Sequence, residues 1–201
     1  MSLTRDQAPA PQGRSGGERR LRRPERREQI LAAATRAFSR AGYADTGLDA
    51  IAAEAGITRV LLYRHFDSKS DLYRAVLDRA FTRLSDAVGS GGFGDDSIPA
   101  LLRAAGEDPE GFRLLFRYAA REAEFRDQMD RFSADAEAAA AHYLAAVVPD
   151  PTWAKWASQL VPTVAIEAVL CWLDAGRPDA EAAARRIDQA IRGVIASVIE
   201  S

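Results

Sequence analysis

The sequence contains few of the residues that carry metal and redox chemistry. Its 201 residues include one cysteine, Cys171, and two histidines, so an intrachain disulfide and a cysteine-based zinc cluster are excluded. No charge-free apolar run of about 18 residues occurs, which argues against a membrane span. The N-terminus lacks the apolar segment of a secretory signal. These absences favour a cytoplasmic protein.

The C-terminal half also lacks the common catalytic patterns. Beyond residue 97 there is no glycine-rich phosphate loop, no set of His or Cys at metal-ligand spacing, and no Ser, His and Asp arrangement. We therefore expect no metal site, no cofactor and no enzymatic activity.

The residues that are present favour helices and an uneven charge distribution. Apolar residues make up 47% of the chain, and alanine is abundant among them. Residues 1–87 contain 16 Lys and Arg against 11 Asp and Glu, a net charge of +5, whereas residues 88–201 contain 11 against 18, a net charge of −7. A basic N-terminal part beside an acidic C-terminal part indicates that the first part contacts a polyanion.

The chain divides into three parts at residues 1–23, 24–88 and 89–201. The first part is rich in Arg, Pro, Gly and Ser, and we expect a disordered basic arm. Four helices are expected in the second part: from Pro24 to Gly42, between Thr46 and Gly56, from Arg59 to His65, and from Ser68 to about Val88. Five are expected in the third part: 98–106, 109–119, 122–147, 152–175 and 179–199. Thr46, Thr58 and Ser68 are the predicted N-caps, and Pro162 is expected to kink its helix.

The segment from Thr46 to Phe66 has the pattern of a helix-turn-helix. Two short helices flank a tight turn that contains Gly56, where a glycine lets the backbone take a positive φ without a Cβ clash. Ile51 and Leu62 are expected to point inward and fix the angle between the helices.

The face opposite Leu62 carries side chains suited to a DNA major groove. At about 100° per residue, this face is Val60, Leu61, Tyr63 and Arg64. Arginine donates twice to a guanine edge, and apolar side chains contact thymine methyl groups. The candidate DNA contacts are Arg59 and Arg64 for guanine, Val60 and Leu61 for thymine methyls, Tyr63 and His65 for phosphates, Thr46 and Lys69 for phosphates at helix starts, and Thr58 at the N-terminal end of the reading helix.

Residues 26–80 resemble the DNA-binding domain of the TetR family of transcriptional regulators. The resemblance lies in Ala37-Phe38 with Gly42-Tyr43, Ile51-Ala52, Ala55-Gly56-Ile57, and Leu62-Tyr63-x-His65-Phe66-x-x-Lys69-x-x-Leu72. It implies an all-α homodimer in which an N-terminal three-helix domain is joined by a fourth helix to a C-terminal ligand-binding and dimerisation domain, about nine helices in all. It also implies that Thr46, Tyr63 and Lys69 hold the phosphate backbone and that residues 58–61 read bases.

Two positions depart from the family pattern. Gly47 stands where the family often has Ser or Thr, which removes a potential phosphate contact, and Leu61 stands where smaller residues are common. The arginines of the N-terminal arm leave two interpretations open: contact with a minor groove or phosphates, or a solubilising role without specific contacts.

For the C-terminal domain the resemblance implies dimerisation and effector binding. The last two helices are the expected dimer interface, with core packing inside one subunit as the alternative. Aromatic residues with a few polar tips are expected to line an effector cavity, although each of them is also an ordinary core candidate. The candidate ligand residues are Phe112, Phe116, Arg117, Arg121, Tyr143, Trp153, Trp156, Glu167 and Trp172.

The resulting hypothesis is a sequence-specific repressor that a small-molecule effector releases from its double-stranded DNA operator. One alternative is an architectural DNA-binding protein without a ligand, which a solid C-terminal core would support and a cavity would oppose. The other is a helical enzyme with an incidental helix-turn-helix, which would need an acid, base or metal constellation that the sequence lacks.

Overall fold

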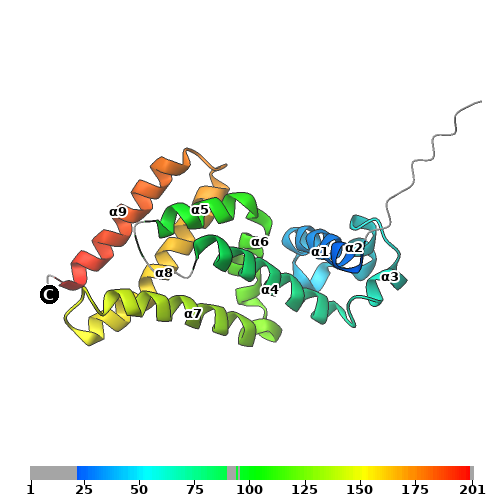
Figure 1. The fold of residues 1–201 in the computed structure, drawn as a ribbon, viewed down its shortest axis with the longest axis horizontal. Coiled ribbons are helices and arrows are strands. Elements are labelled where there is room, and N and C mark those ends of the chain that lie inside the picture. The colour runs from blue at the N-terminus through cyan, green and yellow to red at the C-terminus, as the bar shows by residue number, and fades with distance from the viewer. Residues whose placement is uncertain (1–21, 90–93, 95, 200–201) are drawn as a thin grey trace, which may run out of the picture.

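The computed structural model describes residues 22–89, 94 and 96–199, and within these residues it contains nine α-helices and no strand. The helices are α1 (Arg23–Asp45), α2 (Leu48–Glu54), α3 (Arg59–Tyr63), α4 (Lys69–Val88), α5 (Ser97–Glu107), α6 (Pro109–Arg113), α7 (Arg126–Leu144), α8 (Pro151–Asp174) and α9 (Ala180–Ile199). α1, α2 and α3 gather at one end, α5 to α9 form the larger body, and α4 extends from one to the other (Figure 1). The predicted all-α architecture is confirmed. The predicted basic arm lies outside the described residues, apart from Arg22 and Arg23.

α1 begins close to its predicted start, with Pro24 in its first turn, where a missing N–H costs nothing. The carboxylate of Glu25 accepts a hydrogen bond from the backbone N–H of Arg22 at 2.8 Å and so satisfies the helix start. Gly42 has a φ of 75° and interrupts the helical run, so the turn that ends at Asp45 is set off by a kink.

α4 is capped as the sequence predicts. The hydroxyl of Ser68 accepts a hydrogen bond from the N–H of Asp71 at 2.9 Å, and the Asp71 carboxylate accepts one from the N–H of Asp67 at 3.1 Å. One face of α4, including Leu72 and Val76, is fully buried. α4 therefore belongs to the core and also links the two ends of the molecule.

The chain after α6 departs from the sequence-based expectation. A single helix over 109–119 is predicted, but α6 ends at Arg113 and a π-helical turn follows at Leu114–Tyr118. Two 3₁₀ turns, Ala119–Arg121 and Ala123–Phe125, complete this irregular stretch.

The predicted helix over 122–147 is also shorter than expected, because α7 starts at Arg126 and ends at Leu144. Phe125, just before α7, is fully buried against the N-terminal end of the molecule. The backbone must turn to place this ring, and that tertiary contact overrides the helical periodicity.

Two hydrophobic clusters hold the fold, and their boundary is not at residue 88. The first joins the α1–α4 core, including Phe38 and Tyr73, to Leu114, Leu115 and Phe125. The second joins α5 to α9. The N-terminal helices therefore complete their core with residues from the irregular segment after α6.

α8 is long and apolar enough to cross a membrane by length and composition alone, although no charge-free apolar run of about 18 residues occurs in the sequence. Half of the apolar stretch of α8 is buried in the fold. The core helix of a globular domain can have the same length and apolar composition. The helix continues through Pro162 and packs between α7 and α9, so we interpret it as the central helix of the larger body.

Candidate nucleic-acid interface

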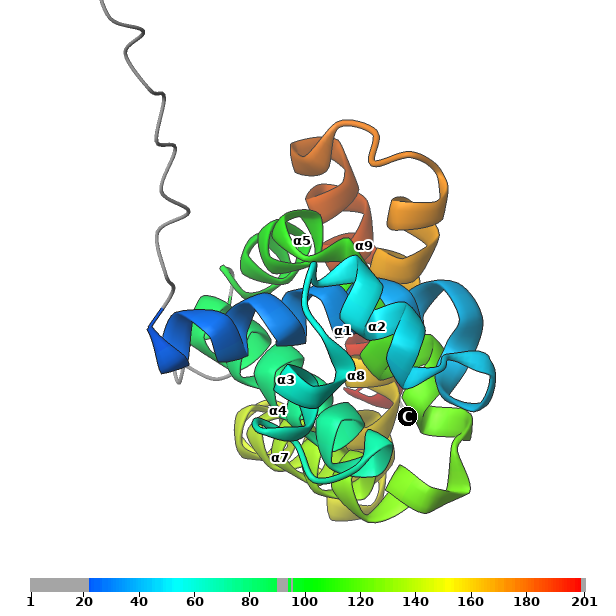
Figure 2. The ribbon, with the colours of Figure 1, turned by 90° about the vertical axis from the view of Figure 1, so that its right-hand side faces the viewer.

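The turn between α2 and α3 has the geometry of a helix-turn-helix. Gly56 has a φ of 63°, and the N–H of Ile57 returns to the carbonyl of Ala52 at 2.9 Å. Ile51 and Leu62 are both 0% exposed and hold the two helices together from inside. Figure 2 views this end of the molecule, with α2 and α3 on the surface.

The outward face of α3 is the one that the sequence predicts. Val60 is 67% exposed and Tyr63 is 43% exposed, whereas Leu62 between them is fully buried. Arg59 and Arg64 are also exposed. A short helix therefore presents two apolar or aromatic and two cationic side chains to solvent on a rigid support.

Thr58 is the N-cap of α3, as predicted, and its hydroxyl accepts a hydrogen bond from the N–H of Leu61 at 3.3 Å. Leu61 and His65 are half-buried at the edges of the exposed face. Thr58 thus fixes the start of the reading helix, where the free N–H groups of a helix favour a phosphate.

Arg59 is held by an acidic neighbour, Asp49, that the periodicity of the sequence does not indicate. Its guanidinium donates to the carboxylate of Asp49 at 2.9 Å and to the hydroxyl of Tyr63 at 3.2 Å. The guanidinium carbon also lies 5.6 Å from the centre of the Tyr63 ring. Asp49 is ten residues away on α2, and only the turn geometry brings it to Arg59.

The prediction that Thr46 caps α2 is wrong. Gly47 is the N-cap, and Thr46 is 3% exposed. The Thr46 hydroxyl donates to the carbonyls of Gly42 at 2.6 Å and Ala37 at 3.3 Å. The kink at Gly42 leaves carbonyls that need a donor, so Thr46 points inward and its hydroxyl does not face a phosphate.

Lys69 begins α4, as predicted, and is partly exposed at its N-terminal end. Its ammonium donates to the carbonyl of Ala44 at 3.0 Å and lies 4.6 Å from the centre of the Tyr43 ring. The position of this cation is therefore set by the turn that follows Gly42.

The first turns of α1 add arginines beside the reading helix. The pKa of His65 is lowered, first by burial and then by the charges of Arg23, Arg27 and Arg26. The guanidinium of Arg27 also lies 4.6 Å from the centre of the Phe66 ring. Arg23, Arg26 and Arg27 therefore extend the basic surface of α3 onto the start of α1.

α1 is fastened to the helix-turn-helix by polar contacts. Gln29 donates to the carbonyl of Ala55 at 2.8 Å, and Arg36 donates to the carboxylate of Glu54 at 2.8 Å. Arg40 bonds the same carboxylate and, with Arg36, lowers the pKa of Glu54. These contacts make α1 and α2 a single support for α3.

Four of the candidate ligand residues are distributed over three clefts. Phe112 lines a cleft between α4 and α5, Phe116 and Glu167 line a second cleft beside α7 and α8, and Tyr143 lines a third beside α9. Phe112 and Phe116 pack on one another with ring centres 4.8 Å apart, but they line different clefts, and Tyr143 lies at the third.

The other candidate ligand residues have structural partners or face solvent. Trp153 and Trp156 are each 44% exposed and pack edge to face on one another, with ring centres 5.8 Å apart. Arg117 donates to Asp174 at 2.7 Å. Trp172 donates to the carbonyl of Pro178 at 2.7 Å, and Arg121 is exposed in the irregular segment. None of these five lines any of the three clefts within the described residues.

The expected dimer helices have two kinds of apolar residue. On α8, Ala157 and Val161 are buried within one subunit, whereas Leu160 and Val164 are only half-buried. On α9, Ile187 and Ile191 are buried. Part of the predicted dimer interface is therefore packed inside one subunit. The half-buried positions remain available for contact with a second copy of the chain. Cys171, on the same helix, is exposed.

Comparison with known proteins supports the interpretation of the geometry. Residues 30–76 match the family described as bacterial regulatory proteins, tetR family. The chain is 41% identical over 113 residues to the HTH-type transcriptional activator FasR of Mycolicibacterium smegmatis. The aligned region covers 51% of this chain and 52% of FasR. It is 50% identical over 54 residues to the HTH-type transcriptional regulator TtgR of Pseudomonas putida. That aligned region covers 27% of this chain and 26% of TtgR. The matches therefore span about half or less of these curated relatives.

The likeness in structure extends further along the chain. A TetR-like transcriptional regulator from Rhodococcus sp. RHA1 superposes with a TM-score of 0.74 at 25% sequence identity, covering 87% of this chain and 98% of that structure. The described residues thus have a two-part, all-helical fold with a helix-turn-helix at one end. Residues 30–76 therefore form a DNA-binding domain of the tetR family type, and the fold of the described residues is similar to that of a TetR-like regulator.

Proposed function

We propose that this chain is a homodimeric, sequence-specific DNA-binding repressor of the bacterial cytoplasm whose C-terminal domain binds a small-molecule effector. The observation that carries the proposal is the exposure of Val60 and Tyr63 on α3, opposite the buried Leu62. A core helix would bury its apolar residues, whereas a reading helix must present them to base edges.

We assign the DNA contacts by chemistry. Arg59 and Arg64 would donate to guanine edges, and Val60 and Leu61 would contact thymine methyl groups. The contacts proposed for the sugar-phosphate backbone are the N-terminal end of α3 at Thr58, with Tyr63, His65 and Lys69. Thr46 is excluded from this set because its hydroxyl is used inside the protein.

Two copies are needed because one short reading helix contacts few base pairs. A two-fold symmetric dimer would place two copies of α3 in successive major grooves, one helical turn of DNA apart. The half-buried Leu160 and Val164 of α8 are the proposed centre of the dimer interface. The mass of the purified chain in solution, measured by light scattering, should be twice the chain mass of 21.8 kDa.

The effector would act by favouring one of two positions of α4, which links the DNA-binding end to the larger body. Of the predicted ligand residues, Phe112, Phe116, Tyr143 and Glu167 line clefts and remain candidates for effector contact. The FasR relative is named an activator, so the direction of regulation needs its own test. A reporter behind the selected operator should lose expression when the chain is supplied, and a gain of expression would refute repression.

The DNA-binding part is tested by selecting ligands from random duplex DNA with the purified full chain. The expected result is a two-fold symmetric site whose half-sites are one helical turn apart. Arg59→Ala should weaken binding to that site by about 1–3 kcal/mol and relax the preference at one base pair in each half-site. Arg103→Ala, an exposed arginine on α5, is the matched control and should bind as the wild type does. Failure to enrich any sequence would refute sequence-specific recognition.

A further inference from the structure

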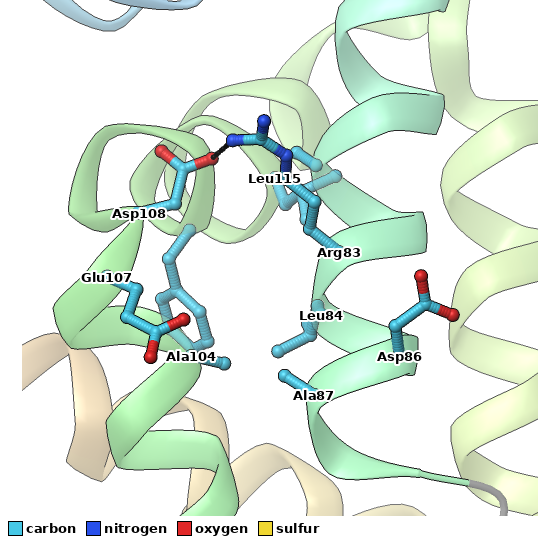
Figure 3. A pocket seen from close by; sticks show the side chains of 10 residues that line it. Arg83, Leu84, Asp86, Ala87, Ala104, Glu107, Asp108 and Leu115 are labelled. Atoms are coloured by element: carbon cyan, nitrogen blue, oxygen red, sulfur yellow. Dashed lines mark ion pairs between the residues drawn. The ribbon is translucent and has the colours of Figure 1, made fainter.

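One cleft lies at the junction between the DNA-binding end and the larger body. It has a volume of about 420 Å³, which is within the size range of small-molecule sites. It opens between α4 and the corner where α5 meets α6 (Figure 3). Its apolar lining consists of Ala80, Leu84, Ala87, Ala104, Phe112 and Leu115.

The polar groups of this cleft carry an excess of negative charge. Arg83 and Asp108 face one another across it with an N–O distance of 3.8 Å, and Glu107 points toward the apolar lining (Figure 3). Asp86, the other acidic lining residue, points away from the opening. Glu107 is exposed to solvent at the edge of the cleft, and within the described residues it has no ion-pair partner, so its carboxylate is available to a cation.

Asp108 has one oxygen that is poorly satisfied. Its Oδ1 accepts a hydrogen bond from the N–H of Gly111 at 2.9 Å, whereas its Oδ2 is buried and has no hydrogen-bond partner in the described part of the chain. Arg79 and Arg83 approach that oxygen only to 3.9 and 3.8 Å, which is too far for a hydrogen bond. Because Oδ2 is buried, a hydrogen-bond donor on a ligand would reach and satisfy it only after Arg79 and Arg83 move away from Asp108.

The backbone at Gly111 maintains this arrangement. A Cβ at that position would lie 2.6 Å from Oδ2 of Asp108, so any side chain there would displace the carboxylate. Gly111 has no positive φ to explain it, and the close approach of Asp108 gives the physical reason for a glycine.

The same two arginines also bind the DNA-binding end. Glu28 of α1 accepts from Arg79 at 2.7 Å and from Arg83 at 2.5 Å. Arg79 is largely buried, with 11% of its side chain exposed. Glu28 from α1 and Asp108 from the α5–α6 corner therefore share one pair of guanidinium groups on α4.

We propose that this cleft is an effector site for an amphipathic organic cation, meaning an apolar body that ends in an ammonium or amidinium group. The body would fill the apolar lining, and the cation would donate to Glu107 and to Oδ2 of Asp108. It would thereby replace Arg79 and Arg83 as the partner of Asp108 and free the α5–α6 corner from α4. The coupling to the operator rests on the proposed DNA-binding function, whereas ligand binding in the cleft does not.

The test uses three probes that share one apolar body: 4-phenylbutylammonium, 4-phenylbutan-1-ol and 4-phenylbutyrate. Their binding to the full-length protein without DNA is measured by isothermal titration calorimetry. The cation should bind about tenfold more tightly than the neutral alcohol, as expected for one added charge-assisted hydrogen bond, and the carboxylate should bind most weakly. Equal affinities for the three probes would overturn the assignment of a cation site.

Two variants locate the binding. Glu107→Gln should reduce the affinity for the cation about tenfold and leave the affinity for the alcohol unchanged. Glu181→Gln, which removes an exposed carboxylate from α9, is the matched control and should bind the cation as the wild type does. Ala87→Phe should fill the lining and abolish binding of both probes. Wild-type affinity for the cation in Glu107→Gln or Ala87→Phe would place its site elsewhere.

The coupling is measured separately, as operator affinity with and without 4-phenylbutylammonium. The cation should weaken operator binding of the wild type and not that of Ala87→Phe. If the cation binds in the cleft and operator affinity stays constant, the site is not the effector site. If the chain binds no DNA at all, the proposed function fails, and the calorimetric result still decides whether the cleft binds cations.

Discussion

The guanidinium of Arg59 donates to the carboxylate of Asp49 at 2.9 Å, so the first residue of α3 is paired with the first turn of α2. Both side chains are more than half exposed, and an exposed pair of this kind contributes about 0–1 kcal/mol to stability. Its value lies in orientation, because a guanidinium that is already positioned loses less freedom when it donates to a guanine edge. Asp49 thus restricts where the Arg59 side chain points before DNA arrives.

We expect Asp49→Asn to bind DNA with lower sequence specificity. Removing the carboxylate frees Arg59 and also removes a negative charge near the phosphates, so binding to random duplex should strengthen while the preference for the selected base pair weakens. The ratio of specific to random affinity, measured by fluorescence anisotropy at one salt concentration, should fall about fivefold to tenfold, as expected when a residue that orients a base contact is lost.

Asp45→Asn is the matched control for this prediction. Asp45 is also an exposed acid close to α2, but the described hydrogen bonds and ion pairs give it no contact with Arg59. It should raise the affinity for all DNA without changing the ratio. An equal loss of specificity in both variants would mean that Asp49 acts through charge alone.

The turn glycine of the helix-turn-helix gives a stability prediction. Gly56 has a positive φ of 63°, and a Cβ built on it would meet nothing within 4 Å, so the cost of a side chain is conformational rather than steric crowding. Gly56→Ala should lower the free energy of unfolding by about 1–2 kcal/mol, and Gly56→Asn should lower it less because Asn adopts this conformation more readily. Urea denaturation measures both, and equal losses for Ala and Asn would contradict the conformational explanation.

The glycine turns and most helix caps could be predicted from the sequence, because they depend only on the conformation and hydrogen bonds of residues that are close in the chain. The kink at Gly42, the turn at Gly56 and the cap at Ser68 each appear where local rules place them. Thr46 is the exception, since a carbonyl exposed by the kink at Gly42 takes its hydroxyl. Local rules also gave the exposed face of α3, because a single buried position, Leu62, fixes the direction of the others.

Contacts between distant parts of the chain could not be predicted in this way. Glu28 and Arg79 are 51 residues apart, and Phe125 packs on Tyr43 with ring centres 4.8 Å apart. Nothing in the periodicity of residues 109–125 indicates that this segment must turn to reach the N-terminal core. For the same reason the aromatic residues of the larger body could be named as a group but not assigned to particular clefts.

The packing of Phe125 makes the stability of the DNA-binding end depend on the larger body. Phe125 is fully buried, with its ring centre 4.5 Å from that of Tyr73 and 4.8 Å from that of Tyr43. Phe125→Ala should therefore destabilise the protein by about 3–5 kcal/mol. Hydrogen exchange should show the loss of protection within α1 and the first half of α4. Trp153→Ala, at an exposed aromatic position, should cost much less and leave those helices protected. Protection of α1 that is unchanged in Phe125→Ala would contradict the shared core.

His65 predicts a pH dependence of operator binding. In the free protein its pKa is lowered, first by burial and then by Arg23, Arg27 and Arg26, so the ring is mostly neutral near pH 7. For folding, a lowered histidine pKa means that stability falls as the pH drops below the unfolded value of about 6.5. For binding, a nearby phosphate favours the charged ring and raises its pKa, so the complex takes up a proton.

Operator affinity should therefore rise as the pH falls from about 7.5 to about 6, beyond the trend of the remaining groups, because the DNA-bound ring takes up a proton that the free ring does not hold. His65→Gln should remove this rise and keep a hydrogen-bond donor at the phosphate. The sequence has only one other histidine, His142, so His142→Gln is a complete control and should retain the rise. Affinity measured at constant ionic strength separates the outcomes: a rise that survives in His65→Gln and disappears in His142→Gln would mean that the titrating group lies in the larger body and that His65 does not contact the DNA.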